Sequence, residues 1–458
     1  MQYVNEARDN AKQKAKDELV GLIGTMGIVS KEMQALLTTI AEVKMNGGMG
    51  SDDGNKTMLR FTDSDQLRFV RFTSGGATNQ LITNAKFRDV SAWYHIVIAV
   101  DTTNSTAGDR LRLYVNGSEI TSFSTESQPT QNYDYDINNT KEHNIGYGTD
   151  NNNHLFDGYM TEVVFIDGQQ LDPTSFGEFD EDTGIWKPID VSGLTFGTNG
   201  FYLDFENSGS LGADVSGNGN NFTVNNLTAI DQSTDTPTNN FATANPLDNY
   251  YFDGSYSNGN VTVTSDTSNY SWNTGTFGVS KGKWYWEIKV ITETTLRQSI
   301  LGISSTQSTG TTQELGDKAN DYGYYNGNGN YRNNNTNTAY GNTYTVGDII
   351  GIALDLDNNK LYFSKNGTFQ NSGVPTSGAT GTGAISITAP ASTPLGAYFP
   401  AWCFFDSSNY AVWDLNFGNP PFTISSGNTD GNGYGNFEYA VPSGYLSLCT
   451  KNLSEVLG

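Results

Sequence analysis

The chain has 458 residues, of which 36% are hydrophobic and 12% aromatic, and it contains 51 glycines. This length allows two to four domains, and the high aromatic content excludes a chain that is disordered throughout. The net charge is −24 with only 25 Lys and Arg, and no run of clustered cations is apparent, so we do not expect nucleic acid as a partner.

The first 46 residues differ from the rest and are predicted to be helical. Residues 1–45 carry six basic and six acidic side chains, so the remainder holds the whole net charge. Apolar residues recur at spacings of three and four over 3–24, and again over 33–43 after Ser30, a suitable N-cap. We expect residues 1–46 to anchor or oligomerise the protein and to contact other proteins. A helical hairpin lying on its own sandwich is the alternative.

From residue 57 the pattern changes to short segments that alternate apolar and polar residues, such as YHIVIAV (94–100) and GYMTEVVFI (158–166). Turn clusters separate them, which predicts antiparallel strands of a β-sandwich over 57–227. Residues 228–248 have almost no apolar run and carry Pro237 and Pro246, so we predict a linker there.

A second series of strand-like segments occupies residues 249–453. They include GKWYWEIKVI (282–291), DIIGIALDL (348–356) and YFPAWCFF (398–405), again separated by Gly/Asn turns. Apart from one turn around 173–179, no helix is predicted after residue 45. The chain is therefore predicted to be mainly β, with two antiparallel sandwiches and a helical N-terminus.

Two hairpins repeat one design about 250 residues apart. IVIAVDTTNSTAGDRLRLYVNG (96–117) and IIGIALDLDNNKLYFSKNG (349–367) each contain an apolar strand, a polar turn and a strand that ends at Asn-Gly. Asn-Gly is the strongest short-range hairpin signal because both residues tolerate positive φ. The repetition predicts two sandwiches of related design.

The first half resembles the laminin-G-like family over about 57–227, through residues 93–120, HNIGYG (143–148) and the segment 156–179. That resemblance implies a concanavalin-like (jelly-roll) sandwich. Such domains usually begin with further strands ahead of what is residue 57 here, where this chain has its predicted helices. The sandwich would then be completed by the N-terminal segment, by another chain, or not fully.

The second half resembles a SPRY domain over about 250–420, through GKWYWEIKV (282–290), residues 344–367 and LGAYFPAWCFF (395–405). This resemblance implies a second concanavalin-like sandwich and a protein-interaction module that binds through loops at one end.

The C-terminal segments 413–422 and 441–453, and the linker, resemble SPRY-containing proteins of viruses that infect aquatic microbes. The combination implies a phage tail fibre or capsid appendage, made in the host cytoplasm and displayed on the virion. We expect it to bind a host-surface protein or glycan through its sandwich loops, as a homo-oligomer with a trimer favoured. A purely architectural virion protein is the second hypothesis and a polysaccharide-degrading glycosidase the third.

No catalytic constellation is apparent, so we expect a non-enzymatic protein without a cofactor. The closest approach to a glycosidase motif is Glu178–Asp182, but Thr183 stands where the second Glu is required. The three histidines do not have metal-ligand spacing. Calcium is the alternative left open, since Asn428–Gly433 and Asp214–Gly219 imitate the start of a calcium loop.

The best candidate for a ligand surface is the segment 321–332, DYGYYNGNGNYR. Tyrosine supplies rigid contact area and Gly and Asn supply adaptable polar contacts, as in evolved binding loops. We expect some of its tyrosines to pack in the core, together with Trp284, Trp286, Trp402 and Trp413. The candidate ligand-binding residues are Tyr322, Tyr324, Tyr325, Asn328, Tyr331 and Arg332.

The remaining sequence features predict neither a disulfide framework nor a membrane span nor a secretory signal. Two cysteines, Cys403 and Cys449, are too few for a disulfide framework, and either one bridge or two buried thiols would fit. No run of 18 apolar residues predicts a membrane span, and the polar N-terminus does not read as a secretory signal.

Overall fold

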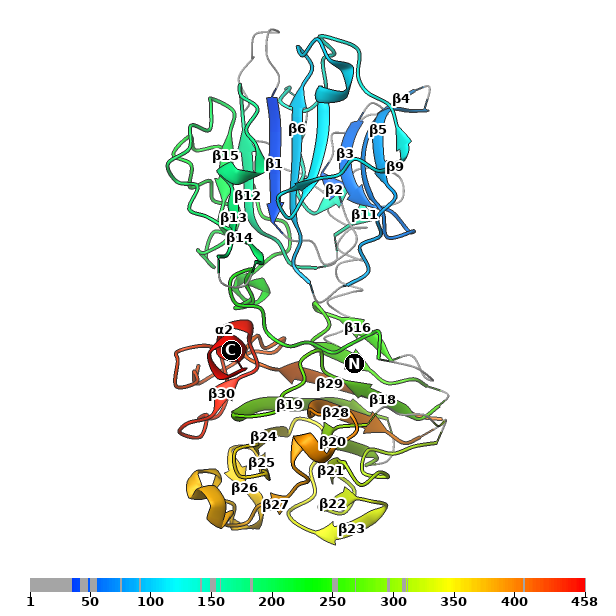
Figure 1. The fold of residues 1–458 in the computed structure, drawn as a ribbon, viewed down its shortest axis with the longest axis vertical. Helices are drawn as coiled ribbons and strands as arrows, with labels where there is room; N and C mark the ends of the chain where they lie inside the picture. The colour runs from blue at the N-terminus through cyan, green and yellow to red at the C-terminus, as the bar shows by residue number, and fades with distance from the viewer. Residues whose placement is uncertain are drawn as a thin grey trace. The chain divides into compact units, whose positions relative to one another are not determined.

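The chain folds into two compact units that meet in sequence between Gln232 and Ser233, and each is described by itself (Figure 1). The computed structural model describes residues 35–41, 48–49 and 56–457, except 75, 90–91, 141, 149–153, 157, 182–183, 249–253, 268, 295–296, 307–309, 311 and 407. No helix within these ranges is long and apolar enough to cross a membrane.

The first unit is a sandwich of two antiparallel sheets, here called sheet A and sheet B. Small hairpins stand beside them: β10 (Tyr147–Gly148) with β11 (His154–Leu155), and β13 (Gly177–Phe179) with β14 (Trp186–Pro188). Sheet A has the order β15 (Phe201–Leu203), β12 (Thr161–Ile166), β1 (Ala35–Ala41), β6 (His95–Asp101), β7 (Leu111–Val115) and β8 (Ser118–Glu119). Sheet B has the order β2 (Gly48–Met49), β3 (Lys56–Phe61), β4 (Leu67–Thr73), β5 (Gly76–Thr83) and β9 (Phe123–Glu126).

The second unit is also a sandwich, formed by sheets C and D. In sheet C, β27 (Ile385–Ser386) also pairs with β25, and β30 (Leu446–Ser447) pairs with β19 in parallel. Sheet C has the order β16 (Ser255–Ser257), β17 (Thr262–Thr264), β29 (Ala411–Asn416), β19 (Lys283–Glu293), β24 (Ile349–Asp355), β25 (Lys360–Lys365) and β26 (Thr368–Phe369). Sheet D has the order β18 (Ser271–Thr274), β28 (Phe399–Phe404), β20 (Ser299–Ser304), β21 (Asp321–Tyr325), β22 (Asn330–Asn333) and β23 (Thr336–Ala339).

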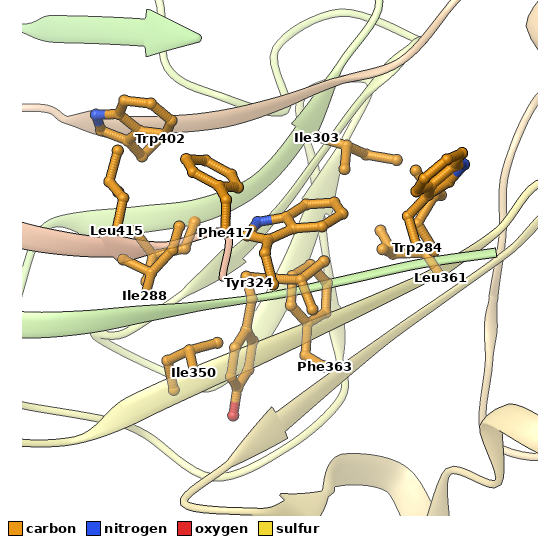
Figure 2. Packing of buried hydrophobic residues seen from close by; sticks show 14 of the residues in the cluster. Trp284, Ile288, Ile303, Tyr324, Ile350, Leu361, Phe363, Trp402, Leu415 and Phe417 are labelled. Carbon is orange, nitrogen blue, oxygen red and sulfur yellow. The ribbon is translucent and has the colours of Figure 1, made fainter. Parts of the chain in front are cut away.

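Each core lies between its two sheets because alternate residues of every strand point inward. In the first unit Leu59 and Phe69 of sheet B meet Ile98 of sheet A. In the second unit the core is built from large aromatic side chains, among them Trp284 and Trp402 (Figure 2). The four predicted tryptophans, Trp284, Trp286, Trp402 and Trp413, are all 0% exposed. The mainly β fold with two sandwiches is confirmed.

The repeated hairpins are structurally equivalent. Asn116 and Asn366 have φ of 48° and 47°, and the following glycines have φ of 73° and 77°. In each, the Asn side-chain oxygen accepts a hydrogen bond from the first residue of the antiparallel strand paired with the one before the turn, His95 N of β6 at 2.8 Å or Ile349 N of β24 at 2.9 Å. The local Asn-Gly signal therefore set the same turn in both units.

The helix predicted over 33–43 is wrong, because Ala35–Ala41 is strand β1 in the middle of sheet A. It pairs with β6 from Ala35↔Asp101 to Ala41↔His95, and with β12 on its other side. Part of the N-terminal segment thus completes the first sandwich, one of the three alternatives. The helix predicted over 3–24 lies outside the described residues.

Two further predictions differ from the structure in the second unit. Within the predicted linker, the side chains of Phe241 and Ala244 are 2% and 0% exposed, and the backbone of Phe241 forms an isolated antiparallel β-bridge with that of Cys449. This segment is therefore part of the second sandwich. The helix α2 (Thr450–Leu457) was not predicted. Both cysteines are buried free thiols. The short 3-10 helices are Ala107–Asp109, Pro173–Ser175, Ala229–Asp231, Gln370–Ser372, Pro375–Thr380 and Pro390–Ser392.

Candidate functional site

Strand alternation divides the candidate residues between the two faces of sheet D. On β21, Tyr322 and Tyr324 point into the sandwich and are 5% and 0% exposed. Tyr325 points to the outer face and is half-buried. On β22, Tyr331 is opposite Tyr324 and packs against the sandwich core, whereas Arg332 is opposite Gly323 and lies on the outer face.

Tyr322 and Tyr324 are structural residues, so they are not available to a ligand. The Tyr324 ring lies beside that of Phe363 (Figure 2). The ring centroids of Phe363 and Tyr344 are each 5.2 Å from that of Tyr324. Its hydroxyl donates to the carbonyl of Asn342. Burial raises the pKa of Tyr324 well above its usual value. The hydroxyl of Tyr322 accepts a hydrogen bond from Thr388 N at 3.0 Å.

Tyr331 and Asn328 have more modest roles. Tyr331 stands edge-on to Tyr340 at 6.0 Å and is half-buried. Asn328 is exposed in the turn between β21 and β22, and its side-chain oxygen accepts a hydrogen bond from Asn330 N at 2.9 Å. That bond closes the turn and leaves the Asn328 amide group at the tip of the loop.

Tyr325 belongs to an aromatic group on the outer face of sheet D. Its ring meets Phe405 edge-on at 5.3 Å, and Phe405 meets Tyr270 at 6.2 Å. A Cβ on Gly327 would come within 2.5 Å of the Tyr325 ring and within 2.8 Å of the carbonyl oxygen of Arg297. Gly327 therefore lets the Tyr325 ring fold over the loop tip, next to the loop that contains Arg297.

Arg332 fixes the loop that contains Glu314 and Asp317, which covers part of the outer face of sheet D. Its guanidinium lies 2.6 Å from Asp317 and 3.2 Å from Glu314, and it donates to the side chain of Asn335 at 2.7 Å. The same loop places Leu315 over the apolar residues of the face, where Leu315 N donates to Cys403 Sγ at 3.2 Å. Since its donors are engaged in these bonds, Arg332 serves mainly to order the surface.

Glu293, at the end of β19, holds two loops together. Its carboxylate accepts hydrogen bonds from Ser299 N at 3.1 Å, Ser299 Oγ at 2.7 Å and Asn326 Nδ2 at 2.8 Å. Burial raises the pKa of Glu293, and these hydrogen bonds act in the opposite direction. The loops that follow β19 and β21 are thus fixed side by side.

We name the resulting feature the loop-end surface, formed by Tyr270, Arg297, Tyr325, Asn328 and Phe405. Arg297 and Asn328 are exposed and the three aromatic rings are half-buried. Aromatic contact area beside adaptable polar groups is suited to holding a macromolecular partner. The sequence pattern predicted two members of the loop-end surface, Tyr325 and Asn328. It missed the other members because they come from segments far apart in the chain, joined only by the fold of sheet D.

The acidic segments considered for catalysis or calcium have structural partners. Glu178 is exposed in the β13–β14 hairpin, and Lys187 lies 3.4 Å from Glu178 and 3.0 Å from Asp180. Both oxygens of Asp430 accept hydrogen bonds from neighbouring chain groups, including Ser447 Oγ at 2.6 Å and Asn432 N at 2.9 Å. Within the described ranges, no group of three or more His, Cys, Asp or Glu side chains is arranged to hold a metal ion.

The second loop considered for calcium is also held by its own backbone. Asp214 Oδ1 accepts hydrogen bonds from Tyr202 N and Ser216 N, both at 2.9 Å. Asp214 Oδ2 accepts from Asn220 N at 2.8 Å. These bonds make Asp214 the organising residue of a turn.

Comparison with known families agrees with the two sandwiches. The SPRY domain family matches residues 283–393, and the Concanavalin A-like lectin/glucanases superfamily matches residues 37–171. The second match begins within β1, in keeping with the place of that strand in sheet A.

Relatives of known sequence share a short segment with this chain. Ran-binding protein 9 of Danio rerio and of Xenopus tropicalis are each 34% identical over 88 residues, which is 19% of this chain and 14% or 16% of those proteins. Ran-binding protein 10 of Danio rerio is 33% identical over 88 residues and 14% of its length. The chain therefore corresponds to a small part of these relatives. Among solved structures, the SPRY domain of human HERC1 aligns with 16% identity and a TM-score of 0.27, covering 36% of this chain and 96% of that one.

Proposed function

Because the chain carries a concanavalin A-like domain followed by a SPRY domain, we propose that it is a non-enzymatic binding protein that holds its partner at the loop-end surface. The observation that carries the proposal is the ordered aromatic group at that end. Tyr325, Phe405 and Tyr270 lie in successive ring contacts, with exposed Arg297 and Asn328 beside them. Preordered rings lose little conformational entropy on binding, which favours affinity.

We also propose a biological role for the protein. We propose that the protein is a structural component of a phage virion, a tail fibre or capsid appendage, and that the loop-end surface contacts a host-surface protein or glycan. The support is the resemblance of the C-terminal segments to SPRY-containing viral proteins. Residues 1–34 would then contact other virion proteins, since Ala35–Ala41 is engaged in sheet A. Several copies, a trimer by preference, would add avidity to a weak single site.

The test compares single variants of the full chain in a cell-adsorption assay. Tyr325→Ala removes an aromatic contact and Arg297→Ala an exposed charge. Lys281→Ala is the matched control, because it is also an exposed basic residue but precedes β19, whereas Arg297 follows it. The 11 residues of β19 separate the two positions by about 35 Å. Adsorption should fall for the first two variants and stay unchanged for the control.

The same experiment separates the alternatives. Adsorption that is equal in all variants, with particles that fall apart when the loop-end surface is altered, would favour an architectural virion role. Turnover of a polysaccharide that disappears in Glu178→Gln would favour a glycosidase and contradict the proposal.

A further inference from the structure

The chain between β29 and β30, residues 418–445, covers the outer face of sheet C, and we call it the covering segment. Its Phe437 packs against Tyr285 of β19, with ring centroids 5.4 Å apart. Its backbone at Tyr439 donates a hydrogen bond to Glu287 at 2.9 Å. Tyr285 and Glu287 alternate along β19 with residues of the sandwich core, so both lie on the outer face of the sheet.

Lys289, the next outward residue of β19, makes a second contact with the covering segment. Its Nζ lies 4.8 Å from the centroid of the Phe422 ring. Phe422 is buried, with 8% of its surface exposed. The face of an aromatic ring attracts an ammonium group, so Lys289 holds the start of the covering segment on sheet C.

Asp414 lies directly opposite Lys289 on the neighbouring strand β29. Directly opposite side chains on paired strands can interact, since their Cβ atoms are about 5 Å apart. Nevertheless, no ion pair within 4.0 Å joins these two residues in the part of the chain that the structure describes. Asp414 is 3% exposed, and its carboxylate accepts a hydrogen bond from Thr262 Oγ1 at 2.6 Å. Such a buried carboxyl group without a paired cation favours its neutral form.

The electrostatics of Asp414 agree with this geometry. Burial raises the pKa of Asp414 from 3.8 to about 7, while the hydrogen bond from Thr262 and the charge of Lys289 act in the opposite direction. With its ammonium group at Phe422, Lys289 compensates the carboxylate only in part. A turn of the Lys289 side chain toward Asp414 would form a charge-assisted hydrogen bond, at the expense of the contact with Phe422. The ring and the carboxylate therefore compete for one cation.

We propose that Lys289 exchanges partners with pH: it holds Phe422 while Asp414 is protonated, and it turns to Asp414 when that side chain loses its proton to the solvent. The exchange frees Phe422, so residues 418–427 loosen from sheet C as the pH rises. The covering segment stays attached further along the chain through Phe437, which keeps the change local. The exchange takes place on sheet C and is independent of the loop-end surface.

The direction of the pH dependence follows from the two arrangements. With Lys289 at Phe422, Asp414 keeps its proton up to about pH 7. With Lys289 at Asp414 the pKa is lower, because a nearby opposite charge favours the charged form. The arrangement at Phe422 is thus fully favoured at low pH and loses its advantage as the pH rises toward 7. The observed midpoint should lie between 3.8 and about 7.

Two other acidic groups lie near this exchange. Glu438 of the covering segment faces Lys289, and hydrogen bonds from Ser425, with a smaller contribution from Lys289, lower the pKa of Glu438 below 4.5. Glu287 lies two residues before Lys289. Burial raises the pKa of Glu287, and backbone hydrogen bonds from the covering segment act in the opposite direction. The experiment must therefore separate Asp414 from Glu287.

The experiment follows the side chain of Lys289 by NMR in the full chain, labelled with 13C-lysine, from pH 5 to pH 8.5. Lys289→Arg identifies the ε-CH2 signal of Lys289 by the loss of that signal. The ring current of Phe422 should shift this signal upfield at the low end of the range, and the shift should disappear as the pH rises, with a midpoint below about 7. Hydrogen–deuterium exchange of peptides from 418–427, corrected for intrinsic exchange, should become severalfold faster over the same range.

Two variants show whether Asp414 is the group that titrates. Asp414→Asn cannot ionise and should keep the upfield Lys289 signal at every pH. Asp348→Asn is the matched control, because it removes the carboxyl group that pairs with Lys365 at 3.0 Å in the same domain. This control should keep the transition of the wild type.

Two results would overturn the proposal. The first is a wild-type Lys289 signal that does not move between pH 5 and pH 8.5. The second is a transition that survives in Asp414→Asn but disappears in Glu287→Gln, which would assign it to Glu287. Phe422→Leu provides a test that does not depend on the folding of these variants: at pH 5 its exchange in 418–427 should equal that of the wild type at pH 8.5, and exchange equal to that of the wild type at pH 5 would contradict the proposal.

Discussion

His95 should make the stability of the first domain depend on pH. Its side chain is 4% exposed, and neither ring nitrogen has a hydrogen-bond partner among the described residues. The ring lies 5.5 Å from that of Trp186, which fastens the β13–β14 hairpin over β6. Burial lowers the pKa of His95 from 6.5 to about 4. The folded state therefore disfavours the protonated imidazole.

The sign and size of the effect follow from that pKa. The unfolded chain binds a proton at His95 below pH 6.5, whereas the folded domain does so only near pH 4. Stability is fully present above pH 6.5 and falls as the pH drops toward 4. Between pH 7 and pH 4.5 the loss should be about 2.5 kcal/mol, from 1.36 kcal/mol for each pH unit between the two pKa values.

The assay is hydrogen–deuterium exchange of the full chain, followed by mass spectrometry of peptides from β6, at pH 7 and pH 4.5 with correction for intrinsic exchange. His95→Phe keeps a planar ring against Trp186 and cannot titrate. Raised carboxyl pKa values in the second domain, such as about 7 for Asp414, change stability in the opposite direction, so the comparison is made within β6. Equal loss of protection in the wild type and in His95→Phe would refute the reasoning.

Three other changes test how the second domain is held together. Glu287→Gln should lower the free energy of unfolding by about 3 kcal/mol, measured by urea denaturation, because the buried carboxylate accepts hydrogen bonds from the backbone of the C-terminal tail, including Tyr439 N at 2.9 Å. Gly367→Ala should lower the free energy of unfolding by about 2 kcal/mol in the same measurement, because φ is +77° and a Cβ would lie 2.5 Å from the Tyr439 ring. A urea denaturation curve equal to that of the wild type would contradict this. Arg332→Met should cost about 1–2 kcal/mol and expose residues 312–320 to hydrogen exchange, since the ion pair with Asp317 is lost; unchanged protection there would show that Arg332 does not order the loop.

The two hairpins were predicted correctly because each turn depends on only two adjacent residues. Asn116-Gly117 and Asn366-Gly367 adopt positive φ as expected, and the preceding strands follow from the alternation of apolar residues. β1 was mistaken for a helix because its neighbours β6 and β12 have buried apolar residues on both faces of sheet A, such as Ile98 on one face and Val97 on the other. A strand between them need not alternate apolar and polar residues. The adjacent threonines of β1, Thr38 and Thr39, were the signal in favour of a strand.

The candidate site was predicted only in part for a similar reason. Alternation alone would have placed Tyr322 and Tyr324 inside and Tyr325 outside, as observed. Contacts such as Tyr325 with Phe405 join segments 80 residues apart, and no local pattern contains them.

We propose that the loop end of the SPRY domain binds the partner and performs no catalysis. The most direct measurement is adsorption of the fluorescently labelled full chain to a panel of aquatic microbial cells, with Asn328→Ala/Tyr325→Ala compared with Lys281→Ala. We expect saturable adsorption to some cells that the double variant loses and Lys281→Ala keeps, with no sugar released from the cells. Adsorption that survives in the double variant, or release of soluble sugar by the wild type, would contradict it.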